Sequence, residues 1–296
     1  MSGPGEVDGA GAALGARGLS VQLGRALAVD AVDLEVTRGA VTAVVGPNGS
    51  GKSTLLRALG RLVAPTAGTV VLDGADVARL RSKQLAQRLG VLPQGPVAPE
   101  GLTVVDLVSR GRDPHRRWYD QWSRADEAVV LDVLARTGML DLAHAAVDDL
   151  SGGQRQRAWI AMALAQQTPV LLLDEPTTYL DVAHQLDVLE LVRRLHEEAG
   201  TTVLMVLHDL SMAARFADRV VALRDGRVVA HGTPAEVVTP ETLRAVFDLE
   251  AHVVADPTTG RPHVMPVGRA STGPDGRRGG GAQDDVTATG TRRATS

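Results

Sequence analysis

The segment GPNGSGKST, which runs from Gly46 to Thr54, constrains the fold more than any other part of this 296-residue chain. It fits the pattern G-x-x-x-x-G-K-[ST], an apolar strand-like run leads into it, and the helix-like stretch TLLRALGRL leads out. Inward-turned backbone N–H groups and the start of a helix hold phosphate in such a loop. The segment predicts an α/β fold with a phosphate site formed by Gly46, Pro47, Asn48, Gly49, Ser50, Gly51, Lys52, Ser53 and Thr54.

The same loop breaks two compositional biases of the chain. Of 31 lysines and arginines only Lys52 and Lys83 are lysine, and Asn48 is the only asparagine. Asn48 tolerates a left-handed backbone, and Lys52 brings a compact charge to the outer phosphates. Ser53 is placed to give its hydroxyl to a Mg²⁺ ion that bridges two phosphate oxygens. The alternative, a glycine-rich turn with a surface lysine, accounts poorly for these features.

The apolar pattern indicates how the rest of the chain is built. Antiparallel β structure is predicted from short β-like runs that flank the strand at 40–45 and lie at about 17–23, 28–36 and 69–73. A parallel sheet covered by helices is predicted because helical periodicity at 182–198 and 209–217 separates further apolar runs, at 170–173, 202–207 and 219–223. We therefore expect a mixed, mainly parallel core sheet with an antiparallel β subdomain.

The remaining segments set the expected domain boundaries. Residues 97–165 have a mostly helical pattern without a strand signal, so we expect an inserted helical subdomain there. Residues 1–15 and 268–296 are rich in glycine or charge and have little apolar surface to bury. We expect both ends to be disordered and one domain to span 16–267.

Two acidic residues follow an apolar strand in VLLLDEPTTYLD. The carboxyl end of a strand in an open α/β sheet is where ligands bind, and Asp174 and Glu175 stand at that point. Asp174 fits a second anchor for Mg²⁺, usually acting through water, and Glu175 fits a base that positions the attacking water. Two ordinary loop-capping acids are the alternative.

Two further polar residues end strands at the same predicted sheet edge. His208 follows the strand TTVLMVL, and Gln94 follows the short strand in GVLPQ. A lone histidine at such a place is more often a structural hydrogen-bonding group than a catalytic one. Gln94 can orient water or ligate Mg²⁺, although by itself it is an ordinary loop residue.

A second amide-rich turn begins the helix in DLSGGQRQRAWI, about a hundred residues after the first. Its residues are Ser151, Gly152, Gly153 and Gln154, and the turn carries no lysine. A helix start of this kind can hold an anion, and a simple N-cap by Ser151 is the alternative at the level of local structure. The stretch therefore resembles half of a phosphate site.

Composition and charge narrow the classes of function. A net charge of −4 and a sequence pI near 6.1 give no basic field, so we expect no nucleic-acid partner. The absence of cysteine rules out disulfides and thiolate metal sites in this chain. The first residues lack the pattern of a secretion signal, and the apolar runs are far shorter than the roughly 18 to 20 residues that cross a bilayer. We expect any membrane role to come through a partner.

Taken in order, the motifs GPNGSGKST, VLPQ, LSGGQ, VLLLDEPTTYLD and VLHD resemble the nucleotide-binding subunit of ABC transporters. The likeness spans about residues 17–267 and implies the ABC ATPase fold and ATP hydrolysis with Mg²⁺. It implies that residues 46–54 bind ATP, that Gln94 is the Q-loop contact, and that His208 is the switch histidine at the γ-phosphate. Glu175 becomes the catalytic carboxylate and Asp181 the D-loop residue.

The resemblance also implies partners. Two copies face each other head to tail, so Ser151 and Gly153 of one copy meet the ATP held by Lys52 of the other. Separate permease subunits hold the chain at the cytoplasmic face of the cell membrane, and an external binding protein delivers the substrate. A soluble ABC ATPase acting in assembly or regulation, without transport, is the alternative from another class.

Finer features indicate a branch of the family. RGRDPH (Arg110 to His115) and EPTTYLDVAHQLDVLEL resemble ATPases that energise uptake of iron–siderophore, haem or cobalamin complexes, and the siderophore branch is our first choice. The alternative is that these segments only pack the interior. One departure is Leu23-Gly24, where the family usually stacks adenine on an aromatic residue. We expect Leu23 to give a weaker or less base-selective hold on ATP.

Overall fold

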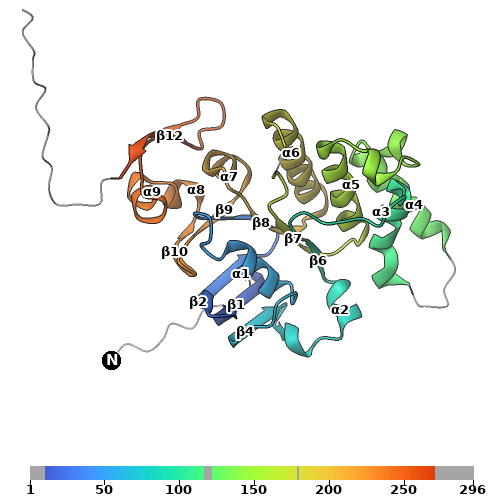
Figure 1. Cartoon of the computed structure of the whole chain (residues 1–296), viewed down its shortest axis with the longest axis horizontal. Coiled ribbons are helices and arrows are strands. Elements are labelled where there is room, and N and C mark those ends of the chain that lie inside the picture. The colour runs from blue at the N-terminus through green and yellow to red at the C-terminus, as the bar shows by residue number, and fades with distance from the viewer. Residues whose placement is uncertain (1–10, 117–121, 179, 271–296) are drawn as a thin grey trace, which may run out of the picture.

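The computed structural model describes residues 11–116, 122–178 and 180–270 (Figure 1). Its central element is a six-stranded sheet in the order β10-β9-β3-β8-β7-β6, in which only β10 is antiparallel to its neighbour. The strands are β3 (Val41–Val45), β6 (Leu89–Leu92), β7 (Val170–Asp174), β8 (Thr202–Val206), β9 (Arg219–Arg224) and β10 (Arg227–Gly232). The predicted mixed, mainly parallel core sheet is confirmed.

Both faces of this sheet are buried because alternate residues of each strand enter different hydrophobic cores. In β7, Leu171 and Leu173 face one core, and Val170 and Leu172 face the other. Strands covered on both faces read as continuous apolar runs, which is why VLLL gave a clear signal. Helices α1 (Lys52–Leu59), α6 (Val182–Ala199) and α7 (Leu210–Phe216) follow β3, β7 and β8, and the predicted helices at 182–198 and 209–217 are confirmed.

A separate four-stranded sheet in the order β2-β1-β4-β5 forms the antiparallel β subdomain. Its strands are β1 (Ala12–Leu23), β2 (Ala26–Thr37), β4 (Ala67–Leu72) and β5 (Ala75–Asp76), followed by the 3₁₀ helix η1 (Val77–Arg79) and α2 (Ser82–Ala86). The expectation of disorder through residue 15 was wrong, since β1 begins at Ala12. Ala13 and Leu14 are 1% and 0% exposed, and their burial explains the order.

The described residues between β6 and β7 fold as helices and short turns without a strand of their own. They comprise α3 (Val104–Ser109), η2 (Arg110–His115), α4 (Arg124–Arg136), η3 (Leu140–Leu142), η4 (Val147–Asp149) and α5 (Gly152–Ala165). Figure 1 shows α3, α4 and α5 gathered on one side of the core sheet. The inserted helical subdomain is therefore present, and α5 joins it directly to β7.

The C-terminal part contains elements that the apolar pattern did not predict. Helices α8 (Pro234–Val237) and α9 (Pro240–Phe247) precede a hairpin of β11 (Leu249–Ala255) and β12 (Pro262–Arg269). Strand β12 continues past the expected start of the tail at 268, because it pairs with β11 up to Leu249↔Arg269. Residues 1–10 and 271–296, which we expect to be disordered, lie outside the described residues. Among the helices of the described part, none is long and apolar enough to cross a bilayer.

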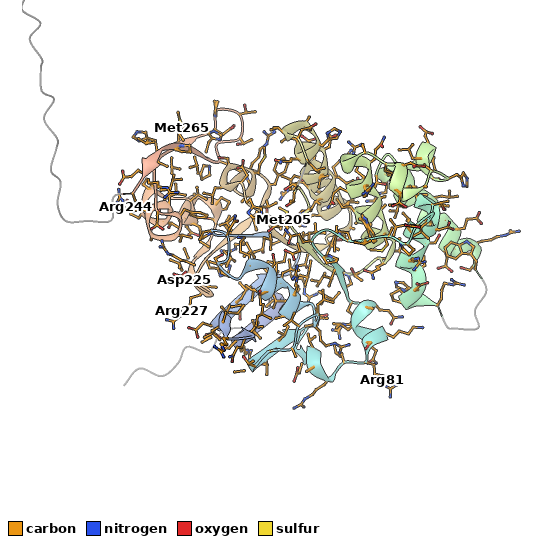
Figure 2. All side chains as sticks on the ribbon, viewed as in Figure 1. Arg81, Met205, Asp225, Arg227, Arg244 and Met265 are labelled. Atoms are coloured by element: carbon orange, nitrogen blue, oxygen red, sulfur yellow. The ribbon has the colours of Figure 1, made fainter. Side chains whose placement is uncertain are left out.

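A polar contact fixes the β subdomain to the core sheet close to the phosphate loop. Arg227, which is labelled in Figure 2, begins β10 after the turn from β9. It forms an ion pair with Asp30 of β2 at 2.6 Å. In the same turn, the Gly226 N–H donates to the Ser50 carbonyl, and the Asp30 N–H donates to the Gly226 carbonyl. The loop is therefore held between two sheets before any ligand arrives.

Candidate active site

The phosphate loop joins β3 to α1, as the motif requires. Gly46 and Gly51 have φ angles of 156° and 98°, and a Cβ on either would lie 2.2 Å from a backbone oxygen, that of Leu223 or Ala28. Only glycine fits these two positions, so the neighbouring strands impose the curvature of the loop. Lys52 then begins α1 with its side chain directed back into the loop.

The ammonium group of Lys52 is held by the loop itself. Its Nζ donates to the carbonyl oxygens of Gly46 and Pro47, both at 2.9 Å. Burial lowers the pKa of Lys52, although the nearby carboxylates of Glu175 and Asp174 act in the opposite direction. An ammonium has three donors, so one is left to reach a ligand.

Glu175 is the centre of a hydrogen-bond network at the carboxyl edge of the sheet. His208 Nε2 lies 2.7 Å from Glu175 Oε1, and Gln94 Nε2 donates to Glu175 Oε2 at 2.6 Å. Thr178 Oγ1 donates to the same Oε2 at 2.9 Å. The structure therefore brings together three predicted residues from the ends of β6, β7 and β8.

The electrostatics of this network keep Glu175 ionised. Burial acts to raise the pKa of Glu175, but hydrogen bonds from His208 and Thr178 and the charge of Lys52 outweigh it, so the pKa is lowered. The backbone of Glu175 has a φ of 53°, in the left-handed region, which costs on the order of 1–3 kcal/mol for a residue with a side chain. The network holds this residue in a strained conformation that turns its carboxylate into the cleft.

Asp174 differs from its neighbour. Its side chain is fully buried, and neither carboxylate oxygen makes a hydrogen bond of good geometry with the described residues. Burial raises the pKa of Asp174, while the Ser53 hydroxyl and the Arg57 guanidinium, 3.4 Å away, oppose this effect. A fully buried carboxylate whose one ion pair is long, and which lies next to a hydroxyl, suits a hard divalent cation.

A cleft of about 440 Å³ connects these groups. The residues that line it are Ala28, Asn48, Gly49, Gly51, Lys52, Ser53, Thr54, Gln94, Glu175, Thr178 and His208. Thr178 and Ala28 were missed by sequence reasoning. The position of Thr178 three residues after Glu175 was an available signal, whereas Ala28 enters only because β2 passes over the loop.

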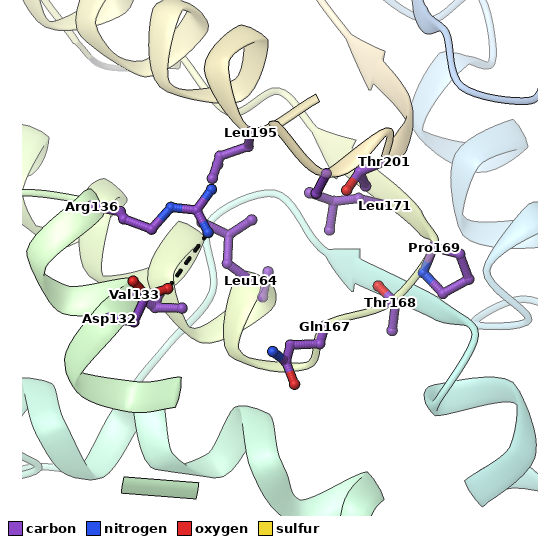
Figure 3. Close-up of a pocket in the computed structure, with 12 residues that line it drawn as sticks. Asp132, Val133, Arg136, Leu164, Gln167, Thr168, Pro169, Leu171, Leu195 and Thr201 are labelled. Atoms are coloured by element: carbon purple, nitrogen blue, oxygen red, sulfur yellow. Dashed lines mark ion pairs between the residues drawn. The ribbon is translucent and has the colours of Figure 1, made fainter. Parts of the chain in front are cut away.

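Another cavity, of about 330 Å³, lies where α4, α5 and α6 meet (Figure 3). It opens at the amino ends of β7 and β8, near Thr168 and Thr201, which is the sheet edge opposite Glu175. Its lining cation, Arg136, is already ion-paired with Asp132 and Glu198. This cavity therefore lies at the wrong edge of the sheet for a phosphate site, and its arginine is already paired with carboxylates.

The second amide-rich turn does not line the cleft. Ser151 caps α5 and forms a capping box with Gln154, because the Ser151 N–H donates to Gln154 Oε1 and the Gln154 N–H donates to Ser151 Oγ. Asp181 caps α6 and also stands outside the cleft. The structure confirms the N-cap, and it separates Ser151, Gly152, Gly153 and Gln154 from the phosphate loop of the same chain.

Leu23 also stands apart from the residues that line the cleft. It ends β1 opposite Ala26 and is 48% exposed. The apolar side chain is therefore available at the surface near the turn between β1 and β2, without a π face.

The fold and the site together define an ATPase of the nucleotide-binding cassette class: a phosphate loop between β3 and α1, acids at the end of β7, and a helical insertion whose last helix, α5, begins with the amide-rich turn. A family model described as ABC transporter matches residues 29–178. The chain belongs to the ABC transporter family, and it is an ATPase subunit of that family.

Individual relatives agree with this assignment. The chain is 49% identical over 257 residues to a petrobactin import ATP-binding protein of Bacillus anthracis, covering 87% of this chain and 94% of the relative. It is 47% identical over 253 residues to the ferric enterobactin transport ATP-binding protein of Escherichia coli strain K12, covering 86% and 93%. Among solved structures, a dimeric bacterial ABC transporter cassette matches with 30% identity and a TM-score of 0.67, covering 74% of this chain and 98% of that one.

Proposed function

We propose that this chain is the ATP-hydrolysing subunit of an importer for ferric siderophores. Two relatives with siderophore substrates in their names are 49% and 47% identical to it over nearly their whole length, which supports the substrate class. The observation that carries the reaction is Glu175, held ionised opposite Lys52 across one cleft.

Residues 46–54 bind the phosphates of ATP in this proposal. The loop amides and the start of α1 face the β- and γ-phosphates, and the free donor of Lys52 reaches the outer oxygens. Ser53, Asp174 and Gln94 would hold the Mg²⁺ that accompanies ATP, and its charge would offset the charge that collects on the transferred phosphoryl group.

Glu175 acts as the base for the attacking water. A γ-phosphate and a water that enter the cleft take the place of the Gln94 contact, so Glu175 Oε2 becomes free to accept the proton of the water. His208 stays on Glu175 Oε1 and orients the carboxylate, with its ring next to the γ-phosphate. Phosphoryl transfer then needs little beyond positioning and charge stabilisation.

The catalytic unit in this proposal is a head-to-tail dimer. Ser151, Gly152, Gly153 and Gln154 stand outside the cleft of their own chain, and they contact the ATP of a second copy, with Asp181 beside them. The dimer docks on permease subunits at the cytoplasmic face of the membrane, and a binding protein outside delivers the substrate. ATP joins the two copies, and its hydrolysis separates them and drives the permease.

Uptake in a strain that lacks this chain tests the proposal. Wild-type chain restores uptake of radiolabelled ferric siderophore, whereas Glu175→Gln does not, and cobalamin uptake stays unchanged in all strains. The purified Glu175→Gln variant binds ATP but loses turnover by a factor of about 100 or more, the usual contribution of a general base. Normal siderophore uptake in the deletion strain would contradict the substrate class, and undiminished turnover of Glu175→Gln would contradict the role of Glu175.

A further inference from the structure

The second glycine of the amide-rich turn stands at a position where the backbone does not require glycine. Gly153 lies in the first turn of α5 and, unlike the loop glycines, has no positive φ. Alanine stabilises a helix by about 1 kcal/mol relative to glycine. The backbone conformation alone therefore does not explain the glycine.

His184 approaches Gly153 closely and leaves little room for a side chain there. A Cβ on Gly153 would lie 2.8 Å from His184 Cδ2 and 3.1 Å from Cγ. A Cβ on the neighbouring Gly152 would meet only Leu180, at an ordinary 4.0 Å. The imidazole ring therefore occupies the space over the Cα of Gly153 and not over the rest of the turn.

Asp181 holds this ring in place. The backbone N–H of His184 donates to Asp181 Oδ1 at 2.9 Å, and the same oxygen lies 2.8 Å from His184 Nδ1. These hydrogen bonds are the leading reason that the pKa of Asp181 is lowered, so the carboxylate is ionised and only accepts. The proton is therefore on Nδ1, which fixes the orientation of the imidazole.

The contact crosses a structural boundary. Gly153 belongs to α5 of the helical insertion, whereas His184 and Asp181 belong to α6 of the core. One helical turn further on, Arg157 of α5 and Asp187 of α6 form an ion pair. We call this boundary between α5 and α6 the seam. Of these contacts, the approach of the His184 ring reaches the amide-rich turn at Gly153.

We propose that His184 is a positioning residue for ATP hydrolysis, which sets the spacing between the Ser151–Gln154 turn and Asp181 so that both meet the ATP of a second copy in register. This inference rests on the dimer of the proposed function. The histidine acts through Gly153 and Asp181 and touches neither ATP nor water. Its loss leaves ATP binding to the single chain intact and slows turnover.

Three substitutions separate the two contacts of the ring. His184→Asn keeps a donor at the position of Nδ1 but lacks the ring that covers Gly153, whereas His184→Phe keeps the ring without the donor. His184→Ala loses both contacts. We expect kcat to fall about tenfold in His184→Ala and less in the two partial variants, with the Kd for a fluorescent ATP analogue unchanged within twofold.

Asp187→Asn is the matched control, since it weakens a contact between the same helices without touching the turn. It should keep kcat within twofold of wild type, and thermal unfolding checks that every variant is folded. A kcat of His184→Ala within twofold of wild type overturns the inference. An equal loss in Asp187→Asn also overturns it, because any loosening of the seam would then suffice.

A double-mutant cycle tests the contact directly. Gly153→Ala should lower kcat about tenfold in the wild-type background, because its Cβ collides with the ring, and at least threefold less in the His184→Ala background. If the loss of kcat in the double variant equals the product of the losses in the two single variants, the contact is contradicted.

Sedimentation of Glu175→Gln with and without ATP measures ATP-dependent dimerisation. It distinguishes a failure of the proposed function from a failure of this inference alone. Absence of an ATP-dependent dimer defeats the proposed function and this inference with it. Normal dimerisation with unchanged turnover of His184→Ala defeats the inference alone.

Discussion

At the scale of single residues, Asp174 and Glu175 show how neighbours in the sequence acquire opposite chemistry. The strand buries Asp174 completely, and its pKa is raised by that burial. The left-handed backbone turns Glu175 toward His208 and Thr178, and its pKa is lowered by their hydrogen bonds. The first carboxylate therefore has only a long ion pair with Arg57 and no hydrogen bond of good geometry among the described residues, whereas the second accepts several hydrogen bonds.

Asp174 should destabilise the nucleotide-free protein at neutral pH. Because its folded pKa lies above the unfolded value, the folded state binds more protons between the two values and loses stability as pH rises through them. We predict that Asp174→Asn raises the free energy of unfolding by on the order of 1 kcal/mol at pH 8. The gain should shrink as the pH falls toward the ordinary carboxyl pKa.

Urea unfolding of both proteins at several pH values measures this difference, and Mg²⁺-dependent ATP binding should weaken in the same variant. If Asp174→Asn is less stable than wild type at pH 8, the carboxylate has a stabilising partner and the assignment as a cation anchor loses its basis.

The family resemblance implies an adenine-stacking aromatic residue where this chain has Leu23. Stacking of a base on an aromatic side chain contributes about 1–3 kcal/mol. We therefore predict that Leu23→Tyr tightens ATP binding fivefold or more and increases the preference for ATP over GTP, measured by competition with a fluorescent nucleotide. Leu27→Tyr, at a similarly exposed leucine of β2, is the control. Unchanged affinity and base preference in Leu23→Tyr would contradict the expectation.

The sequence predicted which residues meet in the cleft better than it predicted their contacts. Lys52, Gln94, Glu175 and His208 were predictable because each follows a strand or completes a loop pattern. Thr178 was overlooked although its spacing of three residues from Glu175 was available. The contact of His184 with Gly153 was not predictable, because a ring over a glycine is a property of packing that no spacing along the chain encodes.

At the scale of elements, the segment RGRDPH is a joint between α4 and α5 of the helical insertion. Arg112 is 8% exposed and donates to Asp126 of α4, to the Ala165 carbonyl at the end of α5, and to Gln167. Gly111 lies against α5, where a Cβ would come 2.3 Å from the Met162 carbonyl oxygen. These contacts support the packing interpretation of the motif.

Removing the buried guanidinium should therefore be costly. Arg112→Met leaves Asp126 as a buried charge without its cation, and loss of one partner of a buried pair costs about 3–5 kcal/mol. We predict a decrease of this size in the free energy of unfolding, measured with urea. Arg110→Ala, two residues earlier and exposed, should change stability by less than about 0.5 kcal/mol. Equal effects of the two substitutions would contradict the joint.

The elements that sequence analysis misplaced lie at the ends of the domain. Residues 12–15 look featureless because their glycine and alanine give no β signal, yet the pairing of β1 with β2 and β4 orders them. Most residues of β11 and β12 are exposed, and the stability of this hairpin depends on packing against α7 and α9. Tertiary contacts, and not local propensity, decide both cases.

At the scale of the whole molecule, the cleft and the amide-rich turn are two half-sites that lie apart in one chain. The cleft holds Lys52 and Glu175, while Ser151 stands at the start of a different helix and lines no part of it. A turn with amides and a hydroxyl but no lysine fits an anion that another copy already holds. Each ATP would then depend on residues of both copies.

Mixing two defective variants tests this claim most directly. In the Glu175→Gln background, Lys52→Ala removes the phosphate contact and Ser151→Arg blocks the amide-rich turn. Each variant alone should remain a monomer with ATP in sedimentation, although Ser151→Arg still binds ATP. An equal mixture should form dimers with one bound ATP per pair, because one of the two composite sites is then intact. A mixture that stays monomeric, while Glu175→Gln alone dimerises with ATP, would contradict a site shared between two copies.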